Sequence, residues 1–195
     1  MTDYTSRSEI FKQLADLYEK MAAAYAELAL RLDFSCQGCE DNCCDSYFQH
    51  YTYLEWAYLW EGLTALPEEQ RQRYLHRARE NAQACATAFA RGERPTVMCP
   101  LNDDGRCGLY DHRLLICRLH GVPARLTNPK GASREFLGCH RCQELLAGRQ
   151  DPPFLDRTPF FRTMVELEQA YQGPGPRRTK IAMTLAEMLL QGPPI

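Results

Sequence analysis

The sequence predicts a mostly α-helical fold, with helices packed around a cysteine-rich, loop-rich metal centre that carries one or two short β-hairpins. Three observations lead to this prediction. Apolar residues recur every three or four positions in several long segments, which is typical of amphipathic helices. Ten cysteines gather in short clusters between these segments. Turn sequences containing glycine divide the cysteine-rich stretch into short extended pieces.

Length and charge fit one domain over residues 1–195. A chain of this size can bury a core without disulfides. The chain has 23 Lys and Arg residues and 25 Asp and Glu residues, so its formal net charge is −2. A nearly neutral chain shows neither the excess of positive charge that binds nucleic acid nor a polybasic patch that binds membranes. The longest apolar run, residues 21–30, contains Glu27 and is far shorter than the ~20 residues of a membrane span. We therefore expect no nucleic-acid or membrane partner; the sequence does not indicate an oligomeric state, a protein partner or an electron donor.

The cysteines indicate a reducing compartment. Their share of the chain is below the ~8–10% that is typical of small disulfide scaffolds. Residues 1–10 are polar and do not resemble a signal peptide. We expect a cytoplasmic protein whose thiols are metal ligands or redox groups.

Three helices are predicted before the second group of cysteines. The first covers residues 8–32, with Ser8 as its expected N-cap. Thr52 and Glu55 match a capping box before the apolar run 56–63. A third helix covers residues 68–91, and its apolar stripe includes Cys85, which we expect to pack as a small hydrophobic residue.

Shorter elements follow. Asn102-Asp103-Asp104-Gly105 predicts a hairpin turn that brings Cys99 and Cys107 close together, and residues 114–119 predict one short helical turn. A second hairpin is expected from residues 122–126 and 133–137. Two helices are expected in the tail, over residues 160–171 and 179–191. Residues 36–145 then form the metal-binding core, flanked by helix 8–32 and the C-terminal helices within 158–191.

Nine cysteines are candidate metal ligands. Thiolates are soft ligands that suit zinc, iron or an iron–sulfur cluster, and Cys-x2-Cys spacing lets two of them converge on one ion. The side chains of the adjacent Cys43 and Cys44 are expected to point in different directions, so both can bind one ion only in a tight turn. Otherwise they bind two different ions, or one of them is structural. Nine thiols permit one tetrahedral site or two. The candidates are Cys36, Cys39, Cys43, Cys44, Cys99, Cys107, Cys117, Cys139 and Cys142.

Other side chains near the cysteines are candidates for a supporting role at the cofactor. Arg113 and Arg118 bracket Cys117, and we expect their charges to offset those of the thiolates. The alternative is that they pair with nearby aspartates, and Tyr110 is expected to pack over the site. Four histidines and two carboxylates near the cysteines are further candidate ligands, with a solvent-facing or supporting position as the alternative for each. They are His50, His112, His120, His140, Glu40 and Asp41, and His120 and His140 are the best of the histidines.

The cysteine segments resemble the YkgJ-type CxxCxxCC family. The resemblance rests on Cys36-Gln-Gly-Cys39-Glu-Asp-Asn-Cys43-Cys44, on Cys99, and above all on Cys107-Gly-Leu-Tyr110-Asp-His-Arg113-Leu-Leu-Ile-Cys117-Arg118. Members of this family are described as zinc- or iron-chelating proteins or as iron–sulfur oxidoreductases. The resemblance therefore implies an iron–sulfur cluster or iron as cofactor, alternatively zinc, in a bacterial cytoplasm.

The chain departs from the family pattern at three places. The first cysteine cluster has one extra residue between Cys39 and Cys43, which affects which thiols share an ion. Leu109 replaces an isoleucine and Leu114 replaces a proline. The final family cysteine corresponds to either Cys139 or Cys142.

Two main functions follow from the sequence, and a third, metal storage or delivery, would require an exposed and labile metal site. The first is a metal-binding protein that holds iron or zinc through its clustered cysteines, as an iron-dependent oxidoreductase if the metal is iron; an iron–sulfur cluster would transfer single electrons. The alternative is a binding or adaptor module with structural zinc and no catalytic activity, whose partner surface is the helix 179–191. No catalytic residue is assigned.

Overall fold

A computed structural model describes residues 6–37, 39 and 43–195. About 53% of it is helical, which confirms the prediction of a mostly α-helical fold. The chain divides into two compact units, each built from two segments that are far apart in the sequence. Unit 1 comprises Met1–Cys43 and Cys117–Pro174, and unit 2 comprises Cys44–Ile116 and Gly175–Ile195.

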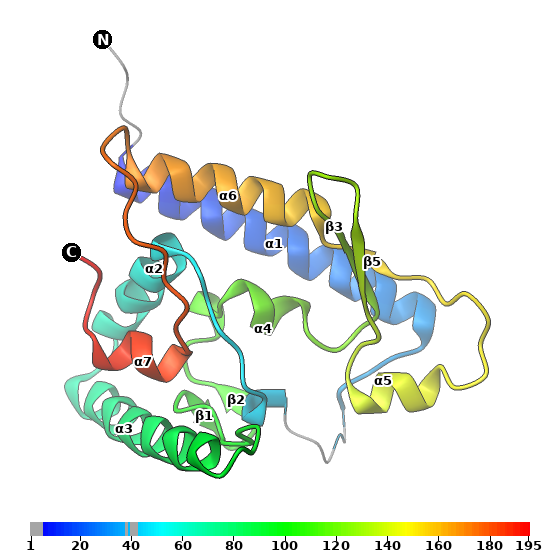
Figure 1. Ribbon diagram of the computed structural model, residues 1–195, viewed down its shortest axis with the longest axis horizontal. Helices are drawn as coiled ribbons and strands as arrows, with labels where there is room; N and C mark the ends of the chain where they lie inside the picture. Colours follow the sequence, from blue (N-terminus) through cyan, green and yellow to red (C-terminus); the bar gives the residue numbers. More distant parts are fainter. Residues whose placement is uncertain (1–5, 38, 40–42) are drawn as a thin grey trace. The chain divides into compact units, whose positions relative to one another are not determined.

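Two long helices pair in unit 1. Helix α1 (Arg7–Leu32) and helix α6 (Thr158–Gln172) run side by side (Figure 1). The ring of Phe11 stacks on that of Tyr171 at 6.3 Å between centroids, so the start of α1 lies beside the end of α6. The N-cap of α1 is Ser6, two residues before the expected Ser8; its side chain accepts a hydrogen bond from the Glu9 amide at 3.2 Å.

The buried face of α1 follows the helical period that the sequence shows. Its apolar residues recur at three or four positions and face the core of unit 1. The helix ends at Asp33, whose positive φ of 56° breaks the helical geometry. The buried residues of α1 are Ile10, Phe11, Leu14, Leu17, Tyr18, Met21, Leu28 and Leu32.

A small sheet completes unit 1. Strands β3 (Ala124–Thr127) and β4 (Ser133–Phe136) form the predicted antiparallel hairpin. Strand β5 (Leu155–Asp156) pairs in parallel with the other edge of β3, which gives the order β4-β3-β5. The short helix α5 (His140–Leu145) follows the hairpin directly and places the second Cys-x2-Cys at its start.

Unit 2 is built on three helices, α2 (Tyr53–Thr64), α3 (Glu68–Ala90) and α7 (Leu185–Leu190). Thr52 caps α2 as predicted, because its hydroxyl accepts a hydrogen bond from the Glu55 amide. The indole N–H groups of Trp56 and Trp60 both donate to the carbonyl oxygen of Met188, at 3.0 and 2.9 Å. These bonds anchor α2 to α7, and α7 in turn packs against α3.

The last helix is much shorter than the predicted 179–191. The backbone of Met183 pairs with that of His50 in an antiparallel bridge, with N–O distances of 2.7 and 3.0 Å, which takes residues before 184 out of the helix. Thr184 and Glu187 then form a capping box that starts α7. The amphipathic pattern therefore overestimated the helix by about one and a half turns at its start.

Short elements connect these helices. The predicted turn at residues 102–105 joins β1 (Asn102–Asp103) to β2 (Arg106–Cys107). The 3-10 helices η1 (Cys43–Asp45) and η2 (Tyr110–His112) and the helix α4 (Leu115–Leu119) complete the described elements.

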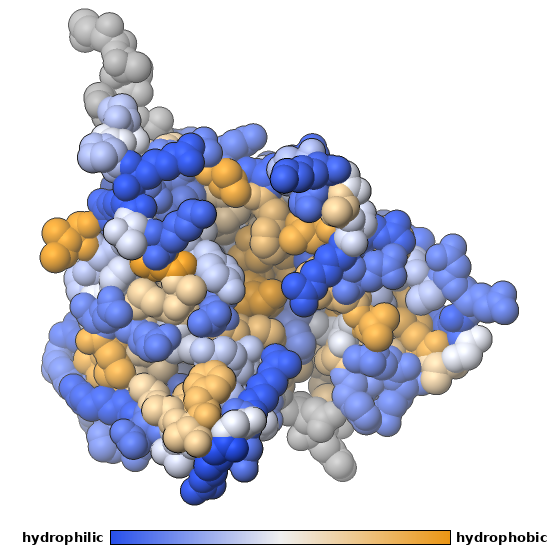
Figure 2. Space-filling model, in the orientation of Figure 1, coloured by the Kyte–Doolittle hydropathy of each residue, from blue (hydrophilic) through white to orange (hydrophobic). Residues whose placement is uncertain are grey.

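Among the described helices, none combines the length and the apolar character needed to cross a membrane. On the face that Figure 2 shows, hydrophilic residues predominate and apolar residues lie between them.

Candidate metal centre

The cysteines divide between the two units. All ten lie in the described part of the chain, and none of them forms a disulfide. The boundary between the units falls between Cys43 and Cys44, so the adjacent pair belongs to different units. The candidate ligands of unit 1 are Cys36, Cys39, Cys43, Cys117, Cys139 and Cys142, and those of unit 2 are Cys44, Cys99 and Cys107.

Tyr25 of α1 lies where the first cysteine cluster of unit 1 meets the second Cys-x2-Cys. A side-chain hydrogen bond joins it to Cys36. The pKa of Tyr25 is raised, first by burial, then by the charges of ionised Cys36 and Cys139, by the hydrogen bond to Cys36 and by the charge of Cys43. Thiols that are about a hundred positions apart in the sequence thus act on the same phenol.

Two glycines allow this close approach. The amide of Cys139 donates to the carbonyl oxygen of Gly121 at 2.9 Å. A Cβ on Gly121 would overlap the Tyr25 hydroxyl, and a Cβ on Gly138 would lie 2.6 Å from the Gly121 oxygen and 3.3 Å from the Cβ of Cys142. Both glycines also have positive φ, +119° and +88°, which side chains rarely tolerate. Only glycine therefore fits at these two positions between α1 and α5.

The second Cys-x2-Cys occupies the start of α5. Cys139 is the N-cap residue, and Cys142, one turn later, is fully buried. Burial raises the pKa of both thiols, and neighbouring thiolates raise it further: Cys36 and Cys39 act on Cys139, and Cys139 and Cys36 act on Cys142, whose pKa reaches about 11. A bound cation would oppose this shift, because it favours the thiolate form.

The thiols of unit 1 fit a thiophilic cation by their chemistry, but they are not yet arranged as ligands. Within the described residues there is no group of three or more His, Cys, Asp or Glu side chains that could hold a metal ion as placed. Two of the candidate residues, Glu40 and Asp41, lie outside the described residues.

A second set of thiols lies in unit 2. The amide of Cys99 donates to the carbonyl oxygen of Cys44 at 2.8 Å, and Cys107 pairs with Asn102 across the hairpin. The amide of Asn102 donates in turn to the carbonyl oxygen of Cys99 at 3.0 Å. Burial, followed by the charges of Cys107 and Cys44, raises the pKa of Cys99 to about 12. The three thiols thus lie within electrostatic reach of one another, as the turn sequence predicts for Cys99 and Cys107.

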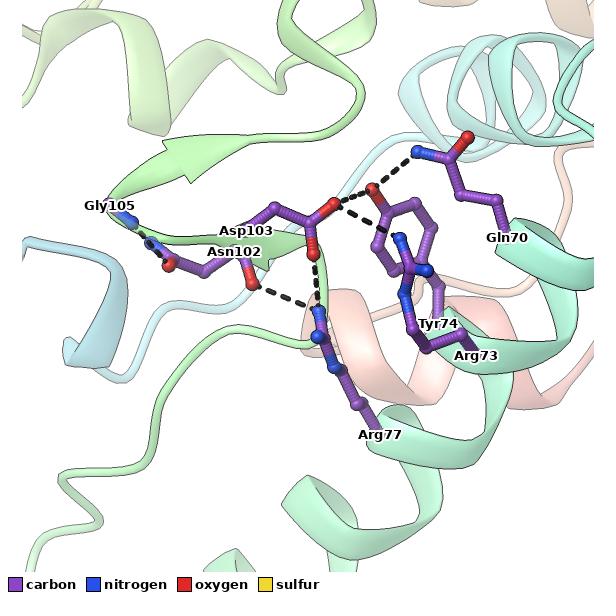
Figure 3. Close-up of polar contacts among 7 residues, drawn as sticks. All are labelled: Gln70, Arg73, Tyr74, Arg77, Asn102, Asp103 and Gly105. Carbon is purple, nitrogen blue, oxygen red and sulfur yellow. Dashed lines mark hydrogen bonds and ion pairs between the residues drawn. The ribbon is translucent and has the colours of Figure 1, made fainter.

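The hairpin that carries Cys107 is held by α3 (Figure 3). Asp103 accepts hydrogen bonds from the Tyr74 hydroxyl and from Arg77, the latter at 2.6 Å, and Arg73 lies 3.5 Å away. Arg77 also donates to the Asn102 carbonyl oxygen at 3.0 Å. Burial raises the pKa of the Asp103 carboxyl, but the bonds to Tyr74 and Arg77 and the two positive charges outweigh it, so the net shift is downward.

The candidate supporting residues Arg113, Arg118 and Tyr110 all take part in cation–π contacts. The guanidinium of Arg113 lies 3.7 Å from the centroid of the Tyr110 ring, and that of Arg118 lies 4.0 Å from the Tyr18 ring. Tyr110 is 59% exposed, so its ring is more open than packing over a buried centre implies. Asp103, one of the alternative partners for these arginines, instead pairs with Arg73 and Arg77.

The histidines near the cysteines differ in exposure. His140 is exposed on α5 and lies 3.6 Å from Glu144, one turn away. His120 is half-buried, and its pKa is lowered by burial and by the charge of Arg157. The half-buried Cys117 lies on α4 just before it.

Sequence analysis missed three residues of the site. Tyr25 is placed on α1 by its helical period, which assigns it to the buried stripe and does not connect it with thiols. Gly121 and Gly138 each adjoin a predicted extended segment, and their role depends on contacts between segments. One feature of the sequence could have indicated this role: Gly138 directly precedes the second Cys-x2-Cys.

Comparison with models of known protein families, with curated proteins and with solved structures found no match for this chain. The resemblance to the YkgJ-type family therefore stays a prediction, and the functional argument rests on the residues themselves.

Proposed function

We propose that this chain is a metal-binding protein whose unit 1 thiols hold iron, as an iron–sulfur cluster or an iron centre, or zinc. The central ligands are Cys36, Cys39, Cys139 and Cys142. The observation that carries the proposal is that two Cys-x2-Cys segments, one after α1 and one at the start of α5, meet around Tyr25 and Gly121 in one compact unit.

Three properties of these thiols support metal binding over a purely structural role. None of them forms a disulfide, one of them is fully buried, and burial together with neighbouring thiolates raises the pKa of Cys139 and of Cys142. Of the four thiols, Cys142 is buried, Cys39 and Cys139 are half-buried and Cys36 is exposed. Ionising the buried thiol alone is costly, and a thiophilic cation removes that cost by binding the thiolate. Zinc would supply a structural link between the two segments, and iron would supply one-electron chemistry.

The alternative is an adaptor module with structural zinc. The structure argues against its proposed partner surface, the helix 179–191. Helix α7 covers only Leu185–Leu190, and it buries Ala186, Met188 and Leu189. We therefore favour the metal centre itself as the functional element of the chain.

Metal analysis of the full chain, purified without air, tests the proposal. We expect stoichiometric iron or zinc; a brown sample that bleaches with dithionite identifies an iron–sulfur cluster, and a colourless zinc protein favours the adaptor. Cys139→Ser and Cys142→Ser should each lower the metal content. Cys85→Ala is the matched control, because Cys85 is half-buried on α3 and donates to Asn81 at 3.7 Å. A metal-free protein under these conditions, or intact disulfides between the ligand cysteines, would contradict the proposal.

A further inference from the structure

Close contacts with another segment of unit 1 hold the phenol of Tyr25 in place, which packing on an amphipathic helix alone does not require. Its hydroxyl lies against Gly121, where any side chain would displace it, and Phe34 lines the same place, 3.7 Å from a Cβ on residue 121. The carbonyl oxygen of the same Gly121 accepts the hydrogen bond from the Cys139 amide. One loop residue therefore fixes both the phenol and the start of α5.

A thiolate sulfur carries no hydrogen, so it can only accept a hydrogen bond. In the hydrogen bond between Tyr25 and Cys36, the phenolic hydroxyl is therefore the donor when Cys36 is a thiolate. A hydrogen bond to a charged acceptor is stronger than one to a neutral acceptor. The contact is therefore strongest when Cys36 is a thiolate, which is its state as a metal ligand.

We propose that Tyr25 is a positioning residue of the metal centre, whose hydroxyl donates a hydrogen bond to the Cys36 thiolate in the metal-loaded protein. This inference rests on the proposed function. The bond holds the Cys36 sulfur next to the second Cys-x2-Cys and withdraws electron density from it. Hydrogen bonds to ligand sulfurs are one of the means by which proteins set the properties of a thiolate-bound metal.

The test uses the full chain loaded with Co²⁺ alone, because cobalt bound to thiolates has a sulfur-to-metal charge-transfer band. Removing the hydrogen bond in Tyr25→Phe leaves the sulfur richer in electrons, so the band moves to lower energy. The affinity for Co²⁺ falls by about 10-fold, at the low end of the 10–100-fold range for residues that support metal ligands. A merely structural role of Tyr25 would change the unfolding temperature and leave the band in place.

Two further variants keep the test specific. Tyr171→Phe removes a phenolic hydroxyl from α6, where the ring stacks on Phe11 at the far end of α1, and should leave the band and the affinity unchanged. Gly121→Ala displaces the Tyr25 hydroxyl and should shift the band in the same direction as Tyr25→Phe. In the double variant of Gly121→Ala with Tyr25→Phe, the band should move no further.

The outcomes separate this inference from the proposed function. Cobalt binding with the same band and affinity in wild type and Tyr25→Phe overturns the inference and leaves the metal centre intact. A phenolate-to-iron band in the iron-loaded protein that Tyr25→Phe abolishes also overturns it, because Tyr25 is then a ligand. Failure of the wild-type chain to bind cobalt, zinc or iron overturns both.

Discussion

The hydroxyl of Tyr74 occupies the space that a side chain on residue 108 would need. Tyr74 is fully buried on α3, and a Cβ on Gly108 would overlap its hydroxyl oxygen. The same hydroxyl donates to Asp103 and accepts a hydrogen bond from Gln70 at 2.9 Å (Figure 3). Gly108 directly follows Cys107, so this contact sets how closely the thiol-bearing hairpin approaches α3.

Gly108→Ala is expected to destabilise unit 2. The added methyl group displaces a buried phenol, and overpacking of this kind costs about 1–3 kcal/mol. Thermal or urea unfolding followed by circular dichroism measures the change. Gly175→Ala is the control, because a Cβ there meets nothing within 4 Å. Combining Gly108→Ala with Tyr74→Phe should cost less than the sum of the two single changes, and strict additivity would show that the two residues are not coupled.

Arg77→Ala is expected to lower stability more than Arg73→Ala. Arg77 donates to the Asp103 carboxylate at 2.6 Å and to the Asn102 carbonyl oxygen, whereas Arg73 lies 3.5 Å from the carboxylate and is more exposed. Exposed ion pairs contribute about 0–1 kcal/mol, so we expect about 1 kcal/mol for Arg77 and close to zero for Arg73. Urea midpoints of the two variants, compared at low and high salt, measure this order; equal losses would contradict it.

The stability of unit 2 should fall as the pH is lowered from about 6.5 to about 4. Burial lowers the pKa of His50 to about 4, whereas the unfolded residue titrates near 6.5. In this range the unfolded chain therefore binds a proton that the folded chain does not, and the loss reaches about 3 kcal/mol at the acid end.

His50→Leu should flatten this part of the pH dependence. The backbone bridge to Met183 does not involve the imidazole, so the variant retains it. His76→Ala, which changes an exposed histidine on α3, should follow the wild-type curve. Urea unfolding at a series of pH values measures both, and a wild-type slope in His50→Leu would show that other groups cause the acid sensitivity.

The two sets of thiols are expected to bind metal independently. Each set is anchored by its own backbone hydrogen bonds, from Cys139 to Gly121 in unit 1 and from Cys99 to Cys44 in unit 2. Cys107→Ser should therefore leave the metal of unit 1 in place, and its effect on metal content should add to that of Cys139→Ser. Elemental analysis of the two single variants and the double variant checks this. Complete loss of metal from either single variant would show that all the ligands serve one centre.

Replacing Cys85 tests its assignment as a packing residue. Its pKa is raised by burial and by the charge of Glu187 on α7, the helix that packs against α3, and its hydrogen bond goes to Asn81 on its own helix. Cys85→Ala should lower stability by about 1 kcal/mol, from the lost sulfur contacts and hydrogen bond, and leave metal content unchanged. Metal loss in this variant would place Cys85 among the ligands.

Much of the local structure could be predicted from short stretches of sequence. The period of α1, the cap at Thr52, the turn at residues 102–105 and the hairpin β3–β4 all depend on residues within a few positions of one another. Helical period, capping and turn formation act over that range, so they are visible without the fold.

The candidate site was only partly predictable for the same reason. The sequence identified the thiols, since Cys-x2-Cys is a local pattern, but their division between two units depends on how remote segments pack. Tyr25 carries no mark that distinguishes it from other tyrosines on a buried stripe, and the bridge from His50 to Met183 spans 133 positions and shortened α7.

By itself, the sequence determined the helical class of this protein, the cap of α2 at Thr52, the hairpin turn at residues 102–105, and the supply of soft ligands in one long stretch of chain. The tertiary structure decided that α1 contributes a phenol to the thiols, that Gly121 gives this phenol room, and that Cys43 and Cys44 belong to different units. The physical reason is the distance along the chain over which each effect acts. Helix, cap and turn preferences act between neighbouring residues, whereas close contact between distant segments depends on the packing of the whole unit.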